Sequence, residues 1–287
     1  MTTAFLPELP QLMIEDQVRA ALLEDLGRAG DITSNATIGP DRQATAEMNS
    51  REAGIIAGLP LAEAAFRLIN PAINFEALVA DGARVEPGTM IARISGPARG
   101  VLSAERVALN YLMHLSGIAT YTARFAGAIA HTKAKVTCTR KTIPGLRSAE
   151  KYAVRCGGGS SHRYGLDDAI LIKDNHIAVA GGVAEALKAA KAFAGHLVKI
   201  EIEVDTLDQF EIVLSEGADV CLLDNMGLEL LRQAVAMNKG RIVLEASGNV
   251  SLDTIRAIAE TGVDFISTSK ITMAAPTLDI GLDIAIS

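Results

Sequence analysis

From about residue 135 onward, short apolar runs alternate with stretches whose apolar residues follow helical spacing. The runs that predict strands are Lys135–Thr139, Ala169–Ile172, Val198–Val204, Val220–Leu223, Arg241–Ala246 and Asp264–Ser267. The stretches that predict helices are Ser148–Cys156, Gly182–Phe193, Leu207–Ser215, Leu228–Met237 and Leu252–Glu260. Strands this apolar, separated by helices, indicate a parallel sheet covered on both faces. Six such strands in succession favour a barrel or near-barrel.

The first third of the chain has a mixed pattern. Residues 14–26 predict a helix with Val18, Leu22 and Leu26 on one face. Further elements are expected as strands at 44–49, 54–57 and 90–94 and as a helix at 61–68. A strongly helical stretch from Ser103 to about Ala130 then leads into the alternating part. In that part, Thr206 and the pair Ser251 and Asp253 are expected to cap helices.

Composition narrows the possible classes of protein. With 287 residues, 49% of them apolar, the chain can bury a large core. A net charge of -7 argues against nucleic acid as the main partner. No apolar run reaches the length of about 20 residues that spans a membrane, and residues 1–13 contain no Lys or Arg, so we expect neither a membrane span nor a signal peptide. The three cysteines lack zinc-site spacing and are expected to be buried, which fits a cytoplasmic protein.

Polar residues follow five successive predicted strands. Catalytic groups of parallel β/α barrels gather at the carboxyl ends of the strands, so these residues are expected to share one rim. In chain order they are Lys173, Glu203, Asp224, Ser247-Gly248-Asn249 and Ser267-Thr268-Ser269. The sequence therefore predicts a functional site at that rim.

The stretch from Thr139 to His176 is locally basic, with seven Lys and Arg against four Asp and Glu, a net charge of +3. Arg140 and Lys141 follow the first predicted strand, and the glycine run 157–159 leads to His162 and Arg163. Glycine lets the backbone approach a ligand closely. Arg suits carboxylates and Lys suits phosphates, so the stretch predicts a site for small polyanions.

Glu203 and Asp224 are carboxylates at this cationic rim. They could pair with Lys173 or Lys141, or hold sugar hydroxyls or a divalent ion. Mg²⁺ favours one or two carboxylates together with phosphate oxygens. The chain contains no HExxH, GxSxG or Walker A pattern, which argues against a zinc protease, a serine hydrolase and a P-loop NTPase.

Several blocks of the sequence resemble the quinolinate phosphoribosyltransferase family. The most specific are Thr139–Arg147 (TRKTIPGLR), Glu150–Val154 (EKYAV), the glycine run with His162-Arg163, and Leu171–His176 (LIKDNH). The resemblance extends to Glu24–Gly27, Gly30–Ser34 and Ser103–Arg106 with Asn110, so it covers nearly the whole chain.

This resemblance implies an N-terminal α/β sandwich domain and an incomplete, seven-stranded α/β barrel, one strand more than the pattern predicts. We place the sandwich at residues 1–116, with segment 275–287 returning to it, and the barrel at residues 117–274. The implied reaction joins quinolinate to phosphoribosyl pyrophosphate with Mg²⁺ and yields nicotinate mononucleotide, pyrophosphate and CO₂ in NAD biosynthesis. The implied enzyme is a pentosyltransferase.

The resemblance also assigns roles to residues. Arg140, His162 and Arg163 would bind the quinolinate carboxylates. Arg106 would reach the same site from a neighbouring subunit, which implies a homodimer and is compatible with a hexamer. Lys141, Lys173, Glu203 and Asp224 would be catalytic and contact phosphoribosyl pyrophosphate, the two carboxylates also facing Mg²⁺, directly or indirectly. The phosphate end would be formed by Ser247, Gly248, Asn249, Ser269 and Lys270.

The sequence departs from the family pattern at three positions. Ser269 and Met273 stand where the family often has Gly and His, and Ile143 stands where a second Thr is usual. Other interpretations remain open at this point: a molybdenum-transport-associated paralogue of the same fold, a barrel lyase that forms a Schiff base on Lys173 or Lys141, or a non-catalytic pocket that senses anions.

Overall fold

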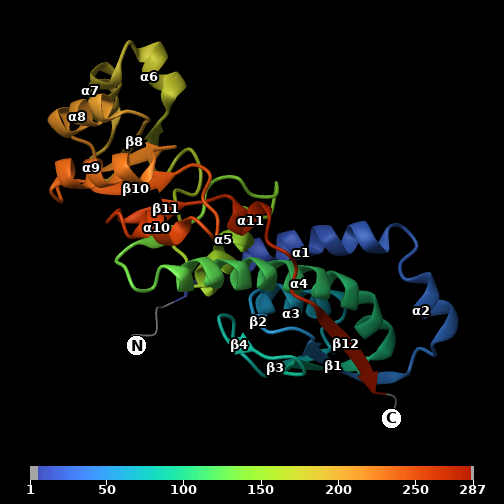
Figure 1. Cartoon of the computed structure of the whole chain (residues 1–287). Coiled ribbons are helices and arrows are strands. Elements are labelled where there is room, and N and C mark those ends of the chain that lie inside the picture. Colours follow the sequence, from blue (N-terminus) through green and yellow to red (C-terminus); the bar gives the residue numbers. More distant parts are fainter. Residues whose placement is uncertain (1–5, 286–287) are drawn as a thin grey trace. The chain divides into compact units, whose positions relative to one another are not determined.

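A computed structural model describes residues 6–285 of the chain (Figure 1). The chain folds into two compact units. The N-terminal unit comprises the residues up to 123, residues 143–158 and the residues from 275 onward, and the barrel unit comprises residues 124–142 and 159–274. The domain limits expected from the sequence differ from this division at residues 117–123 and 143–158, which group with the N-terminal unit. We expected no signal peptide in residues 1–13, and the first five of these residues lie outside the described range.

The N-terminal unit combines helices with an antiparallel sheet. Its helices are α1 (Gln11–Leu26), α2 (Ile32–Thr37), α3 (Leu59–Ile69), the first part of α4 (Ala98–Ala128), and α5 (Arg147–Cys156). Its strands are β1 (Gln43–Ser50), β2 (Gly54–Ile55), β3 (Asn74–Ala77), β4 (Arg84–Val85), β5 (Met90–Pro97) and β12 (Ile280–Ala285). The sheet order is β12-β1-β5-β3, so the end of the chain pairs with β1, and β2 pairs separately with β4.

Residue patterning explains this unit. Strand β1 alternates exposed and buried positions, with Ala46 and Met48 completely buried. Helix α3 buries Leu61 and Phe66, and its N-terminus is held by Asp81, which accepts from the amides of Gly58 and Leu59 at 3.0 and 3.1 Å. The helices expected at 14–26 and 61–68 and the strand at 44–49 are therefore confirmed.

The barrel unit contains a six-stranded sheet in the order β6-β11-β10-β9-β8-β7. Its strands are β6 (Lys135–Thr137), β7 (Ile170–Ile172), β8 (Ile200–Val204), β9 (Val220–Asp224), β10 (Val243–Ser247) and β11 (Phe265–Ser267). Every neighbouring pair is parallel. Helices α7 (Val183–Phe193), α8 (Leu207–Glu216), α9 (Leu228–Asn238) and α10 (Ile255–Ala259) lie between the strands in sequence (Figure 1). The predicted incomplete α/β barrel is confirmed.

The seventh strand of the expected barrel is reduced to a bridge in the described part of the chain. Ser160 forms an isolated parallel bridge with Thr137 of β6, supported by the Ser160 amide donating to the Val136 carbonyl at 2.8 Å. The glycine run 157–159 precedes this bridge and supplies no side chains that could pack a regular strand. The six-strand pattern read from the sequence is therefore closer to the structure than seven regular strands.

Two short helices of the barrel unit were not predicted, α6 (Asp174–Ala180) and α11 (Lys270–Met273). Helix α6 buries none of its residues, so it carries no apolar periodicity. Thr206 caps α8 as expected, accepting from the Gln209 amide at 3.2 Å. The cap expected from Ser251 and Asp253 is wrong, because α10 begins later, at Ile255, after Thr254. Among residues 6–285, no helix has both the length and the apolarity needed to cross a membrane.

Candidate active site

The carboxyl ends of the barrel strands surround a cavity of about 730 Å³. It is lined by Thr139, Arg140, Lys141, His162, Arg163, Leu171, Lys173, Glu203, Leu222, Asp224, Asn225, Glu245, Ser247, Gly248, Asn249, Val250, Ser267, Thr268, Ser269 and Lys270. Side chains alternate across a strand, so residues two apart, such as Glu245 and Ser247, point to the same face. The cavity brings together every site residue expected from the sequence within the barrel unit.

The loop after β6 is fixed at Lys141 from two directions. The Lys141 amide donates to Oγ1 of Thr139 at 3.0 Å, and its carbonyl accepts from Oγ1 of the buried Thr272 on α11 at 2.8 Å. These bonds hold the backbone while the Lys141 side chain stays exposed and the neighbouring Arg140 is half-buried. The loop therefore directs two cationic side chains to the cavity while hydrogen bonds hold its backbone in place.

Arg163 carries an unsatisfied donor. One terminal nitrogen of its guanidinium donates to the Ala169 carbonyl at 3.1 Å. Its Nε is buried and has no hydrogen-bond partner among residues 6–285. Burial and the neighbouring Arg140 lower the pKa of Arg163, with Glu201 and Asp168 acting in the opposite direction. A buried N–H without an acceptor is costly, so an anion in this cavity would relieve the guanidinium.

Lys173 and Glu203 form an ion pair at the cavity wall, with Nζ and Oε2 2.6 Å apart. The Lys173 amide donates to Nδ1 of His176 at 2.9 Å, which fixes the turn from β7 into α6. His176 thus orients this loop by accepting this hydrogen bond. Asp224 accepts from the side-chain amide of Asn225 at 2.7 Å. Glu203 is accordingly both a partner of Lys173 and a lining carboxylate.

The loops after β9 and β10 form a tight cradle. Asn225, Gly248 and Asn249 all have left-handed backbone conformations, with φ of 54°, 98° and 51°. A Cβ at Gly248 would overlap Oδ1 and the backbone nitrogen of Asn225, so no other residue fits there. The Asn225 amide also donates to the Ser247 carbonyl at 2.9 Å. Asn225 is a lining residue that the sequence reasoning missed, although it directly follows the predicted Asp224.

The two departures from the family pattern near the last strand differ in position. Ser269 lines the cavity beside Lys270. Met273 ends α11 with 56% of its surface exposed and is not among the residues that line the cavity. Ser269 is thus the departure placed to change ligand contacts.

Two carboxylates under the rim were also missed. Glu201 and Glu245 are buried, with Glu201 two residues before Glu203 on the same face of β8. Nε2 of His162 lies 2.9 Å from Oε2 of Glu201 and 3.7 Å from Oε1 of Glu245. Burial, together with the neighbouring Glu201, raises the pKa of Glu245 to about 7. The period-two spacing Glu201–Glu203 was the available signal.

Arg106 belongs to the N-terminal unit. It is exposed on α4 and, with Asn110 and His114, lines a separate cavity of about 400 Å³. Nε2 of His114 lies 3.0 Å from Oε1 of the completely buried Glu150. The structure thus places Arg106 on the surface of the N-terminal unit, apart from the residues that line the cavity at the carboxyl ends of the strands.

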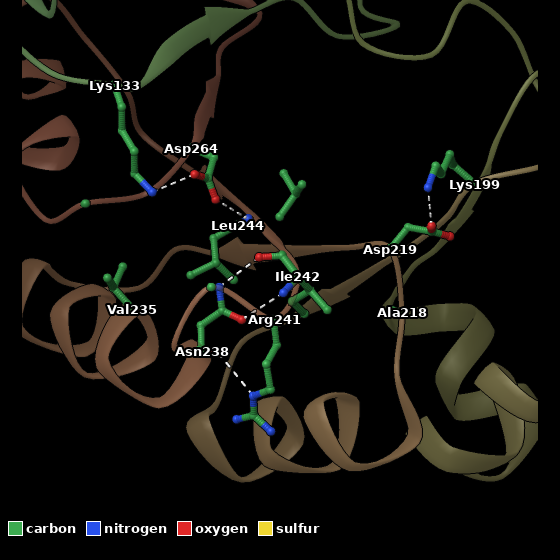
Figure 2. Close-up of a pocket in the computed structure, with 13 residues that line it drawn as sticks. Lys133, Lys199, Ala218, Asp219, Val235, Asn238, Arg241, Ile242, Leu244 and Asp264 are labelled. Atoms are coloured by element: carbon green, nitrogen blue, oxygen red, sulfur yellow. Dashed lines mark hydrogen bonds and ion pairs between the residues drawn. The ribbon is translucent and has the colours of Figure 1, made fainter.

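The amino ends of the same strands surround a second cavity, of about 450 Å³ (Figure 2). Lys133 points to Asp264, with Nζ and Oδ1 2.7 Å apart, and Lys199 points to Asp219, with Nζ and Oδ1 2.5 Å apart (Figure 2). Both aspartates also accept from a strand amide, Leu244 and Ile200 respectively, at 2.9 Å. These charges are bound into the sheet, which is typical of the stabilising face of a barrel.

Known proteins resemble this chain along nearly its whole length. Family models described as "Quinolinate phosphoribosyl transferase, N-terminal domain" and "C-terminal domain" match residues 31–116 and 118–283. The chain belongs to this family. A nicotinate-nucleotide pyrophosphorylase [carboxylating] of Mycobacterium leprae (strain TN) is 43% identical over 274 residues, covering 94% of this chain and 96% of that protein. A probable nicotinate-nucleotide pyrophosphorylase [carboxylating] of Bacillus subtilis (strain 168) is 40% identical, covering 96% and 95%.

A solved structure agrees with these relatives. The nicotinate-nucleotide pyrophosphorylase of Francisella tularensis superposes with a TM-score of 0.94 at 39% identity, covering 99% of this chain and 100% of that one. The incomplete barrel of this chain is therefore the fold of a solved member of the same family. The three cysteines are free and buried, as predicted, and burial raises the pKa of the Cys156 thiol to about 12.

Proposed function

We propose that the chain transfers the phosphoribosyl group of phosphoribosyl pyrophosphate to quinolinate and releases CO₂, giving nicotinate mononucleotide and pyrophosphate. Family membership across both domain models is the observation that carries this assignment. The cationic cavity supports it, because Arg140, Lys141, Arg163, Lys173 and Lys270 line one space. Two polyanions held there would repel each other less strongly and could meet in reactive alignment.

Each part of the cavity suits one part of this reaction. Arg140 and Arg163 would bind the two carboxylates of the pyridine ring, since guanidinium groups match carboxylate geometry. Ser247, Gly248 and Asn249 would receive the 5′-phosphate at the cradle after β10. Glu203 and Asp224 would face the ribose, where negative charge stabilises an oxocarbenium-like transition state. Lys141 and Lys173 would lie between the two substrates and neutralise the charge that accumulates there.

The chemistry requires no strong base from the protein. The pyridine nitrogen is itself the nucleophile, and its electron pair forms the bond to C1 of the ribose while the bond to pyrophosphate breaks. The ring nitrogen then carries positive charge, which stabilises the electron pair left on the ring carbon when CO₂ departs. This pair takes up a proton, which replaces the CO₂ and completes nicotinate mononucleotide. The main task of the chain is therefore to position the substrates and exclude water.

Mg²⁺ is the cofactor we propose. The donor set fits it, because Glu203 and Asp224 supply carboxylate oxygens beside a space large enough for a pyrophosphate. Bound there with substrate phosphates, the ion would offset the charge of the leaving pyrophosphate. Residues Glu203 and Asp224 would hold it directly or through water.

The experiment is a turnover assay with purified protein, quinolinate, phosphoribosyl pyrophosphate and Mg²⁺. We expect nicotinate mononucleotide and CO₂ in equal amounts, loss of activity with a chelator, and no comparable turnover of nicotinate. Activity on nicotinate alone would overturn the substrate assignment. Borohydride trapping of a keto substrate on a lysine would instead support a Schiff-base lyase.

We further propose a cytoplasmic homodimer in which Arg106 completes the active site of the neighbouring subunit. The exposed position of Arg106 on the N-terminal unit supports the shared site, and three free cysteines support a reducing compartment. Arg106→Ala and Lys141→Ala proteins should each be inactive and regain part of the activity when their subunits are mixed. Absence of recovery after verified subunit exchange would contradict a contribution from the partner.

A further inference from the structure

His162 stands on a buried acidic floor formed by Glu201 of β8 and Glu245 of β10. Glu201 is 7% exposed and Glu245 is 4% exposed. Their Oε1 atoms have no hydrogen-bond partner in the part of the chain that the structure describes. Nε2 of His162 is 2.9 Å from Glu201. A buried carboxylate with so few partners destabilises the fold, which is typical of a group that is kept for a specific role.

The hydrogen bond at the second ring nitrogen of His162, Nδ1, indicates which tautomer the ring adopts above the two carboxylates. Nδ1 accepts a hydrogen bond from the backbone amide of Arg163 at 2.8 Å, so Nδ1 carries the lone pair. The proton of the neutral ring therefore lies on Nε2, where it is donated to Glu201. A metal ion in this cluster would need the Nε2 lone pair, and an imidazolium would need a proton on Nδ1. Either one would therefore have to displace a hydrogen bond that the structure shows, from Nε2 to Glu201 or from the Arg163 amide to Nδ1.

The contact with Arg163 ties the floor to the anion cavity. The Nδ1 contact with its amide fixes the main chain from which the Arg163 side chain projects. That side chain is anchored at Ala169 and presents a buried, unpartnered Nε. Because guanidinium recognition of a carboxylate is sensitive to small displacements, the orientation of this backbone matters for binding.

We infer that Glu201 is a positioning residue for quinolinate, which acts by holding His162 as the Nε2–H tautomer and thereby fixing Arg163 in the anion cavity. This inference rests on the proposed function, since it assigns the effect to binding of the pyridine dicarboxylate. His162 then serves as the link between the floor and Arg163, in place of a direct donor to the substrate.

Glu245 of β10 is the second carboxylate of the floor. It lines the cavity and lies farther from Nε2 than Glu201 does, at 3.7 Å. Burial and the charge of Glu201 raise the pKa of Glu245 to about 7, so it is mostly protonated below neutral pH. Of the two carboxylates, Glu201 is therefore the nearer and stronger acceptor for Nε2 of His162.

The test compares two substitutions of Glu201. Glu201→Gln keeps an oxygen that accepts from Nε2, whereas Glu201→Leu removes it at similar volume. We expect Glu201→Leu to raise the KM for quinolinate by roughly tenfold or more, the effect of losing a hydrogen bond to a charged group. Glu201→Gln should recover most of this loss, and the KM for phosphoribosyl pyrophosphate should change less than about twofold in both.

A nitrogen NMR measurement tests the mechanism independently of turnover. Protein labelled with ¹⁵N-histidine should give one signal of an Nε2–H tautomer that His162→Asn removes. In Glu201→Leu this signal should shift toward the other tautomer or a mixture. If unsubstituted protein fails to turn over quinolinate, the proposed function fails while this signal still tests the His162 contact.

A matched control separates positioning from general destabilisation. Asp81 is a half-buried carboxylate that accepts from the Tyr152 hydroxyl at 2.7 Å within the N-terminal unit. Asp81→Asn should lower the melting temperature and leave both KM values unchanged. An unchanged quinolinate KM in Glu201→Leu, or an Nδ1–H tautomer in the unsubstituted protein, would overturn the inference.

Discussion

At the carboxyl ends of the barrel strands Lys173 pairs with Glu203 beside a cavity of about 730 Å³, and at the amino ends Lys199 pairs with Asp219 beside one of about 450 Å³ (Figure 2). The pairs are chemically alike but differ in what else they touch. Asp219 also accepts from a strand amide, which binds it into the sheet. Glu203 lies among cations that include Arg163, whose Nε has no partner in residues 6–285. The ion pairs alone therefore do not distinguish the two cavities, whereas the buried, unpartnered Nε of Arg163 is found only at the carboxyl-end cavity of the two.

The pKa values of the two ends point in opposite directions. Burial works to raise the pKa of Asp219, but hydrogen bonds from Lys199 and the Ile200 amide outweigh it and lower the pKa. At Glu245 burial and the nearby Glu201 together raise the pKa to about 7. The environment of Asp219 at the amino end thus stabilises its charge, whereas the ionisation of Glu245 at the carboxyl end opposes folding.

The largest expected effect comes from removing the lysine of the functional pair. Lys173→Ala should lower kcat/KM by roughly a thousandfold, as expected for loss of a preorganised charge at developing negative charge. Its melting temperature should stay nearly unchanged, because the Lys173 side chain is 47% exposed and such pairs contribute little to stability. Steady-state kinetics and calorimetry measure the two quantities.

Lys199→Ala is the matched control for that change, since it removes the lysine of the equivalent pair at the other end. It should leave kcat/KM within about twofold of the unsubstituted value. If both lysine variants lose activity equally, the contrast between the two ends is wrong.

The sequence predicted the barrel well because parallel strands and their helices leave strong, separate patterns. The rule that catalytic groups follow the strands also located Lys173, Glu203, Asp224 and Ser247. It missed Glu201 and Glu245 because it considers only strand ends, and these residues lie further down the inward faces. Their partners in space, His162 and Ser267, come from other strands and loops, so only folding brings them together.

Other misses have equally physical causes. β3 shows mostly exposed positions, and α6 buries no residue, so neither leaves an apolar period to detect. The seventh barrel strand is replaced by the bridge at Ser160, which follows glycines that have no side chains to pattern. The role of His162 depends on which ring nitrogen faces which neighbour, and no sequence pattern carries that information.

The next largest expected effect is the pH dependence of stability that arises from Glu245 at the carboxyl end. The folded-state pKa of Glu245 is raised, so its favourable contribution is complete below the unfolded value near 4.5 and is lost as pH rises toward 7. The unfolding free energy should therefore decrease by on the order of 3 kcal/mol across this interval through Glu245. Glu245→Gln should remove that part of the decrease.

Urea unfolding at pH 5 and pH 8 checks this prediction. The difference in unfolding free energy between the two pH values should be larger for the unsubstituted protein than for Glu245→Gln. Equal differences would show that Glu245 ionises as freely in the folded chain as in the unfolded one. Asp219 at the amino end should have the opposite effect on the unfolding free energy. Its pKa is lowered, so its stabilisation is present above the unfolded pKa and is lost as pH falls.

The smallest expected effect comes from the amino end. Asp264→Ala removes the acceptor of the Leu244 amide as well as the partner of Lys133. The unsatisfied strand amide should cost about 1–2 kcal/mol, which corresponds to a fall in melting temperature of about 2–6 °C. Lys133→Ala should lower the unfolding free energy by less than about 0.5 kcal/mol. The Lys133 side chain is 64% exposed, and its removal leaves the bond between Asp264 and the Leu244 amide intact. Both variants should keep the kcat/KM of the unsubstituted enzyme. Loss of activity in either variant would show that the amino-end cavity contributes to catalysis at the carboxyl-end cavity.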